Sequence, residues 1–169
     1  MIALARTSWP WISIAARLLV GGVWIAAGAL KFGDPAESVR AVRAYQMLPE
    51  AVVPTIGHGL PALEVLVGVL MIVGLGLRFV SGLSGLMQLA FIIGIASVWA
   101  RGIEIECGCF GGGGANADAT SQYPWDIARD VGLLVLSALL MIWPRSRLCL
   151  DRVLMPPLDD AEMRTDPHG

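Results

Sequence analysis

Two cysteines separated by a single glycine, Cys107 and Cys109, are the residues of this chain best suited to chemistry. In an extended backbone, residues i and i+2 point to the same side about 6.5 to 7 Å apart at Cα, which is the outer limit for a disulfide. A bend at Gly108 would bring the sulfurs together in a tight, strained ring. Because strained disulfides are easily reduced, the spacing predicts a reversible thiol–disulfide pair.

Other interpretations of the pair stay open: a static bridge, half of a metal site, or two idle thiols. A metal would need about two further ligands, whereas the segment 102–114 contains no histidine and no third cysteine. Glu104 and Glu106 flank the thiols, and nearby negative charge raises the pKa of a thiol. An activated thiolate would therefore need a cation such as Arg101 or Arg129, or a partner protein.

The composition indicates where this pair works. Hydrophobic residues make up 56% of the 169 residues and charged residues 15%, which lies well outside the range of soluble domains. The mean hydropathy is +0.67. The net charge of -2 and the lack of a dense basic cluster argue against a nucleic-acid partner. We therefore predict an all-α membrane protein whose surroundings are the lipid bilayer.

Four apolar stretches are long enough to cross a bilayer, which takes about 20 residues: about 9–31, 54–77, 80–100 and 125–143. A signal peptide is the competing interpretation of the first stretch, because Ala27-Gly28-Ala29 resembles a cleavage site. Arg17, however, interrupts its apolar core, and three similar spans follow, so we expect a retained helix. Gly22 and Ala26, four residues apart, would let another helix approach it closely.

A short helix is expected between the first two spans. Asp34, Pro35 and Glu37 match a helix start, and the residues from Ser38 to Leu48 are amphipathic, as in helices that lie on a membrane surface. The predicted fold is a four-transmembrane-helix bundle with this interfacial helix after the first span and the cysteine loop between the third and fourth. Residues 1–143 form the domain, and residues 144–169 are expected to be a polar, disordered tail.

The arginines suggest an orientation. Four spans put both termini on one side of the membrane. The basic residues on that side are Arg6, Arg78, Arg145, Arg147 and Arg152, and those on the opposite side are Lys31, Arg40, Arg43 and Arg101. The positive-inside rule then favours cytoplasmic termini in the plasma membrane. The Cys107 loop would then be extracytoplasmic. This side suits a thiol pair used for disulfide exchange, because the cytoplasm would hold the thiols reduced. Cys149 would be a cytoplasmic spectator.

Several polar residues are candidates for supporting roles. Arg17 and Glu64 lie at depths in the membrane from which they could pair inside the bundle. Alternatively, Arg17 extends to the inner lipid headgroups and Glu64 is protonated. Asp126 and Asp130, with Arg129 beside them, could pair with Arg101 or order the loop, or they could form a solvated helix end. His58, near the same outer surface, could move protons to or from a thiolate, although such a histidine is more often structural.

With these residues in view, the chain resembles the MauE/DoxX group of four-helix, redox-associated membrane proteins, and specifically its MauE-like branch. The resemblance covers about residues 10–143. Its sharpest element is Cys107-Gly108-Cys109-Phe110-Gly111, followed by Arg129-Asp130 on the last helix. The softer matches are Arg17-Leu-Leu-Val-Gly-Gly with Ala27-Gly-Ala-Leu-Lys-Phe32, Asp34-Pro35, Tyr45-Gln-Met-Leu-Pro49, and Pro61-Ala-Leu-Glu64 with Gly68.

The resemblance implies a role in making or maintaining disulfides in exported proteins, in the founding case the subunits of methylamine dehydrogenase, with a thioredoxin-like partner. It does not imply that this chain acts on methylamine. Two functions follow: a thiol–disulfide oxidoreductase, or a non-catalytic membrane scaffold or assembly subunit whose cysteines only shape a loop. The sequence has no recognisable site for a quinone, flavin or haem, so no cofactor is assigned and the electron acceptor or donor stays open.

Overall fold

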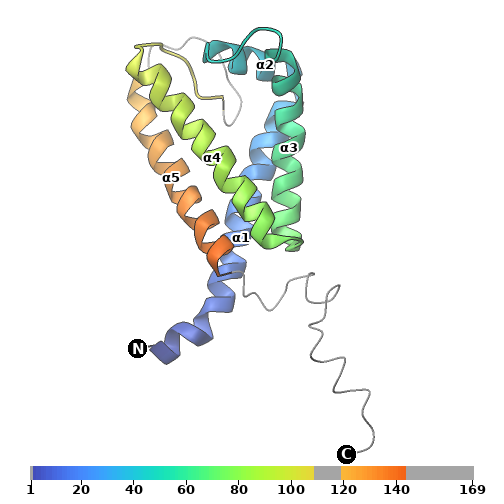
Figure 1. The fold of residues 1–169 in the computed structure, drawn as a ribbon, viewed down its shortest axis with the longest axis vertical. Helices are drawn as coiled ribbons and strands as arrows, with labels where there is room; N and C mark the ends of the chain where they lie inside the picture. Colours follow the sequence, from blue (N-terminus) through green and yellow to red (C-terminus); the bar gives the residue numbers. More distant parts are fainter. Residues whose placement is uncertain (1, 109–118, 144–169) are drawn as a thin grey trace, which may run out of the picture.

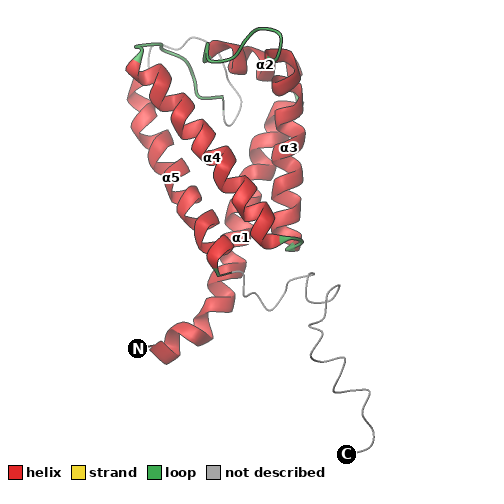
Figure 2. Cartoon of the chain, in the orientation of Figure 1, coloured by secondary structure: helices red, strands yellow, loops and turns green. Residues whose placement is uncertain are grey.

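A computed structural model describes residues 2–108 and 119–143 of the chain, with side chains from residue 11 onward. These residues form five helices and no strand, as the all-α prediction requires (Figure 2). The helices are α1 (Ile2–Phe32), α2 (Pro35–Ala44), α3 (Val53–Val73), α4 (Leu77–Ala100) and α5 (Ala119–Ile142). Cys109, Cys149 and the predicted disordered tail lie outside the described residues.

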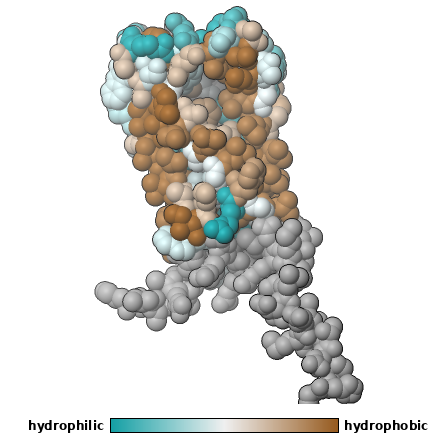
Figure 3. Space-filling view, in the orientation of Figure 1, coloured by the Kyte–Doolittle hydropathy of each residue, from teal (hydrophilic) through white to brown (hydrophobic). Residues whose placement is uncertain are grey.

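Three helical segments are long and apolar enough to cross a membrane: Trp11–Phe32, Val53–Val73 and Leu77–Ala100. Large hydrophobic side chains lie exposed on them, among them Leu66, Phe79 and Leu86. On the face that Figure 3 shows, hydrophobic residues (brown) cover much of the length of the bundle. Helix α5 has 24 residues, a sufficient length, but Asp126, Arg129 and Asp130 make its first half polar. The fourth span therefore stays a prediction.

The helices pack mainly as two pairs, α1 with α3 and α4 with α5 (Figure 1). Helix α2 lies across one end of the bundle, beside the start of α3, and residues 101–108 lie at that same end. A buried polar chain joins the pairs: the Trp24 indole N–H donates to the Ser84 hydroxyl at 2.8 Å, which lies 3.0 Å from the Ser137 hydroxyl.

Close packing of α1 on α3 depends on glycines of both helices. A Cβ atom added at Gly28 would lie 2.6 Å from the Pro61 carbonyl oxygen, and one at Gly68 would lie 2.6 Å from that of Gly21. The backbones are thus in direct contact, as small residues permit in membrane helices. The prediction for Gly22 and Ala26 is wrong: a Cβ at Gly22 meets no described atom within 4 Å, and Ala26 is exposed.

The short helix predicted between the first two spans is confirmed as α2, but it is shorter than predicted. The Asp34 carboxylate accepts from the Glu37 backbone N–H at 3.0 Å, which caps the first turn. The helix ends at Ala44 rather than Leu48, because the chain turns at Gln46 with a φ of 52°.

Two other boundaries differ from the prediction. The turn between the second and third spans lies at Gly74 and Gly76, with φ values of 76° and 57°, and not at Arg78, which belongs to α4. Glycine adopts these left-handed angles without steric cost, so it ends α3 before the apolar run ends. Helix α5 begins at Ala119, six residues before Trp125, and includes Pro124.

Candidate functional site

Two tyrosines hold the loop that carries Cys107. The Tyr123 hydroxyl, from the first turns of α5, accepts from the Ile105 backbone N–H at 3.0 Å and lies 2.8 Å from the carbonyl oxygens of Ile103 and Ile105. The Tyr45 hydroxyl, from the end of α2, donates to the Cys107 carbonyl at 2.7 Å. These bonds fix the loop backbone on both sides, so Cys107 has a defined position at the end of the bundle.

Cys107 is half-buried between two cavities of different chemistry. One, of about 300 Å³, is apolar and lies among α2, α3 and α4, with Leu60 and Phe91 in its wall. The other, of about 320 Å³, is polar and is lined by Glu106, Gln122, Tyr123, Asp126 and Arg129. The cysteine therefore borders both an apolar space and a charged one.

A buried ion pair joins the two helices of the first pair. The Lys31 ammonium donates to Oε1 of Glu64 at 2.5 Å, and their side chains are 5% and 0% exposed. Lys31 also lies 5.7 Å from the centre of the Phe91 ring, over its face. Both ends of this pair are desolvated, so either charge alone would be costly inside a membrane.

The predicted Arg17–Glu64 pair is therefore wrong. Arg17 instead donates to the carbonyl oxygens of Met71 at 3.0 Å and of Ile72 at 2.7 Å, where α3 ends. Side chains lean toward the N-terminus of their own helix. In the antiparallel α1–α3 pair, Lys31 and Glu64 lean toward each other, whereas Arg17 leans away from Glu64. Arg17 thus satisfies carbonyl groups at the end of a helix far from the cysteine loop.

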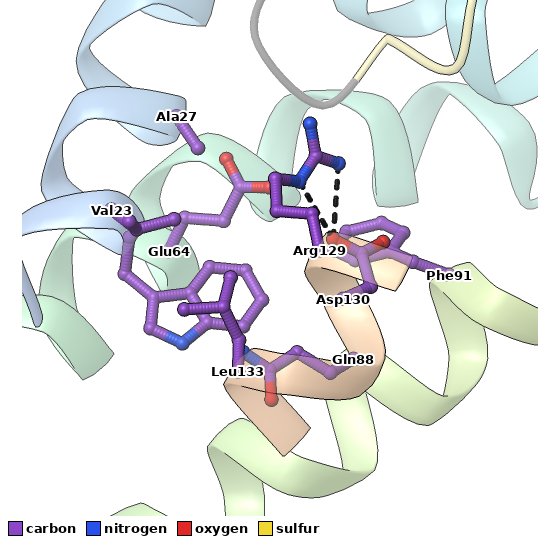
Figure 4. Close-up of a pocket in the computed structure, with 9 residues that line it drawn as sticks. Val23, Ala27, Glu64, Gln88, Phe91, Arg129, Asp130 and Leu133 are labelled. Atoms are coloured by element: carbon purple, nitrogen blue, oxygen red, sulfur yellow. Dashed lines mark hydrogen bonds and ion pairs between the residues drawn. The ribbon is translucent and has the colours of Figure 1, made fainter. Parts of the chain in front are cut away.

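Arg129 is the predicted supporting residue that the structure brings to Cys107. Its guanidinium lies 3.1 Å from an oxygen of Asp126 and 3.0 Å from one of Asp130, and it lines the polar cavity beside Cys107. It also lines a small cavity together with Glu64 and Asp130 (Figure 4). Arg129 therefore lies between the cysteine loop and the buried carboxylates.

Arg101 and His58 have other contacts. Arg101 donates to the carbonyl oxygen of Tyr45 at 2.5 Å and to that of Ser97 at 3.2 Å, so it ties the end of α4 to the end of α2. It is not the partner of Asp126 or Asp130, whose ion pairs are made with Arg129. His58 is exposed, its Nδ1 lies 2.7 Å from the Pro54 carbonyl oxygen, and it lines neither cavity beside Cys107. This geometry fits the structural interpretation of the histidine.

A family model described as methylamine utilisation protein MauE matches residues 9–144. The chain belongs to the MauE family. The match spans most of the sequence, and together with the three apolar helices it makes the chain a multi-pass membrane protein. No curated protein and no solved structure shows significant similarity to it.

Sequence reasoning missed three residues of this MauE-family site: Lys31, Tyr45 and Tyr123. Lys31 was interpreted as the end of the first span. It continues a buried stripe at helical spacing with Val20, Trp24 and Ala27, and this periodicity could have identified it. The two tyrosines act on backbone groups far along the chain, and no local pattern predicts such contacts.

Proposed function

We propose that this MauE-family protein exchanges disulfides with a thioredoxin-like protein outside the membrane, using Cys107 and Cys109. The observation that carries the proposal is the position of Cys107. The Tyr45 hydroxyl donates to its backbone carbonyl, and the residue lies in the wall of a polar cavity. Arg129 lines the same cavity, where its guanidinium is paired with Asp126 and Asp130.

The exchange needs no further cofactor. A thiolate of the partner attacks one sulfur of the Cys107–Cys109 disulfide, which forms a mixed disulfide and releases the other sulfur as a thiolate. The second thiolate of the partner then attacks the mixed bond. The partner leaves oxidised, and the loop keeps two electrons and takes up two protons. The reverse sequence reduces the partner, and the reduction potentials of the two proteins decide the direction.

The orientation that the arginine distribution predicts is compatible with this role. We propose cytoplasmic termini and an extracytoplasmic Cys107 loop, from the arginine distribution along the chain. The name of the family connects it with methylamine utilisation. We propose that the protein serves that process by forming or maintaining disulfides in exported proteins.

Single serine variants test the proposal. With Cys109→Ser or Cys107→Ser, the resolving thiol is missing, so a mixed disulfide with the partner should accumulate and be visible on a non-reducing gel after alkylation. The Cys149→Ser variant is the control and should trap nothing. If neither single variant traps a partner, and the Cys107→Ser/Cys109→Ser double variant still supports disulfide formation in exported proteins, the protein is a scaffold.

A further inference from the structure

Two buried carboxylate oxygens in the middle of the bundle have no hydrogen-bond partner among the described residues: Oε2 of Glu64 and Oδ2 of Asp130. The other oxygen of each group is occupied, by Lys31 and by Arg129 respectively. The Glu64 and Asp130 side chains are only 0% and 6% exposed. A buried carboxylate oxygen without a donor is destabilising, so the structure lacks a donor here.

Both carboxylates line the same small cavity. It measures about 20 Å³ and is also bounded by Trp24, Gln88 and Phe91. Figure 4 shows Glu64 from α3 and the Arg129–Asp130 pair from α5 projecting toward one another across it. The space suffices for one water molecule, which needs about 10 to 15 Å³ and two or more polar partners.

The ion pairs that meet at the cavity do not balance. Lys31 of α1 and Arg129 of α5 supply two cations, against three carboxylates: Glu64 of α3, Asp130 of α5 and Asp126 of α5, which lines the neighbouring polar cavity and shares Arg129 with Asp130. Helix α4 contributes only the uncharged Gln88 and Phe91 to the lining. One negative charge is left over within the bundle, where an uncompensated charge is costly. A single added proton removes the excess charge and also supplies the missing hydrogen-bond donor.

We propose that Glu64 and Asp130 form a buried proton-binding site that holds one proton between them at neutral pH, through a water molecule in the cavity. The protonated carboxyl group donates to the water, and the water donates to the free oxygen of the other carboxylate. Arg129 lines both this cavity and the polar cavity beside Cys107, so the proton exchanges with solvent from the end of the bundle that carries the cysteine loop.

Infrared spectroscopy of the full chain in lipid nanodiscs tests the site directly. At pH 7 we expect the C=O stretching band of one protonated carboxylic acid, which shifts in D2O. The band should be lost in the Asp130→Asn and Glu64→Gln variants and unchanged in Glu104→Gln, which alters an exposed carboxylate on the loop. The Cys107→Ser/Cys109→Ser protein should show the same band, which separates this site from the proposed disulfide exchange.

The wild-type protein alone can overturn the proposal, whether or not the variants fold. Absence of the band at pH 7 would show that both carboxylates are ionised. Persistence of the band in both folded variants would place the proton elsewhere. A band seen in choline chloride but absent in sodium chloride would identify a cation site instead. Alkaline titration of the wild-type band in a single one-proton step is the supporting result.

Discussion

At the scale of single residues, the Lys31–Glu64 pair is the interaction whose loss should matter most. Replacing Lys31 with Met leaves Glu64 desolvated and without its ion-pair partner, which costs on the order of 3 to 5 kcal/mol. The double variant Lys31→Met/Glu64→Leu removes both charges and should cost less than either single substitution. A double-mutant cycle on unfolding free energies in detergent measures this coupling.

The same cycle with Arg17 in place of Lys31 is the control. Arg17 contacts backbone carbonyls of α3 rather than Glu64, so its substitution should add to that of Glu64 without coupling. Additive costs for Lys31 and Glu64, or strong coupling of Arg17 to Glu64, would contradict the observed pairing.

Tyr123 has a comparable role in the loop. Tyr123→Phe removes the acceptor of the Ile105 N–H, and a buried donor left unpaired costs about 1 to 3 kcal/mol. The loosened loop should also increase the alkylation rate of Cys107, measured in a variant that keeps Cys107 as its single cysteine. Trp125→Phe, two positions further along and 74% exposed, should leave the rate unchanged. Equal rates for Tyr123→Phe and the parent would show that the tyrosine does not restrain the loop.

At the scale of helices, the contact between α1 and α3 depends on where a glycine points. Gly28→Ala places a Cβ against the Pro61 carbonyl and should destabilise the protein by about 1 to 3 kcal/mol, because the helices must separate. Gly22→Ala enters open space and should stabilise it by about 0.5 to 1 kcal/mol through better helix propensity. Thermal unfolding of the two variants distinguishes them, and similar shifts in both would refute the packing.

The first turn of α2 should respond to acid through Asp34. The backbone N–H of Glu37, and then the Arg40 guanidinium, lower the pKa of this carboxyl below its usual 3.8. A lowered folded-state pKa means that the contribution of Asp34 is present above about pH 4 and is lost as the pH falls through the lower folded value.

The Glu37 amide resonance, followed by NMR, should report this loss in acid. Asp34→Asn keeps a capping oxygen that does not titrate, so the change of the Glu37 resonance over the same pH range should be smaller in this variant. An identical acid response in the Asn variant would exclude Asp34 as the titrating group.

At the scale of the whole molecule, the side of the cysteine loop depends on three helices only. If α1, α3 and α4 cross the membrane, residues 101–108 lie on the side opposite the start of α1, whatever α5 does (Figure 1). Helix α5 then decides only the side of the C-terminus.

A membrane-impermeant thiol reagent tests this sidedness. In intact cells, after reduction, a variant that keeps only Cys107 should be labelled, and one that keeps only Cys149 should be labelled only after permeabilisation. Labelling of Cys149 without Cys107 in intact cells would reverse the orientation.

The sequence alone determined the features that depend on neighbouring residues. Apolar length predicted three helices that the structure confirms as candidate spans, and Asp34 with Pro35 predicted the start of α2. Helix ends were less predictable. An apolar run continues through Gly74 and Gly76, and only the backbone conformation shows that the chain turns there.

The tertiary structure decided which side chains meet. Arg17 and Lys31 are both cations on the first helix, and sequence reasoning chose the wrong one for Glu64. Likewise it named Gly22 and Ala26 for the helix contact, whereas the contact is made at Gly28. The outcome depends on how each helix is rotated about its axis and on the lean of side chains toward the N-terminus. Those quantities are set when whole helices pack together, so a pattern within one span does not contain them.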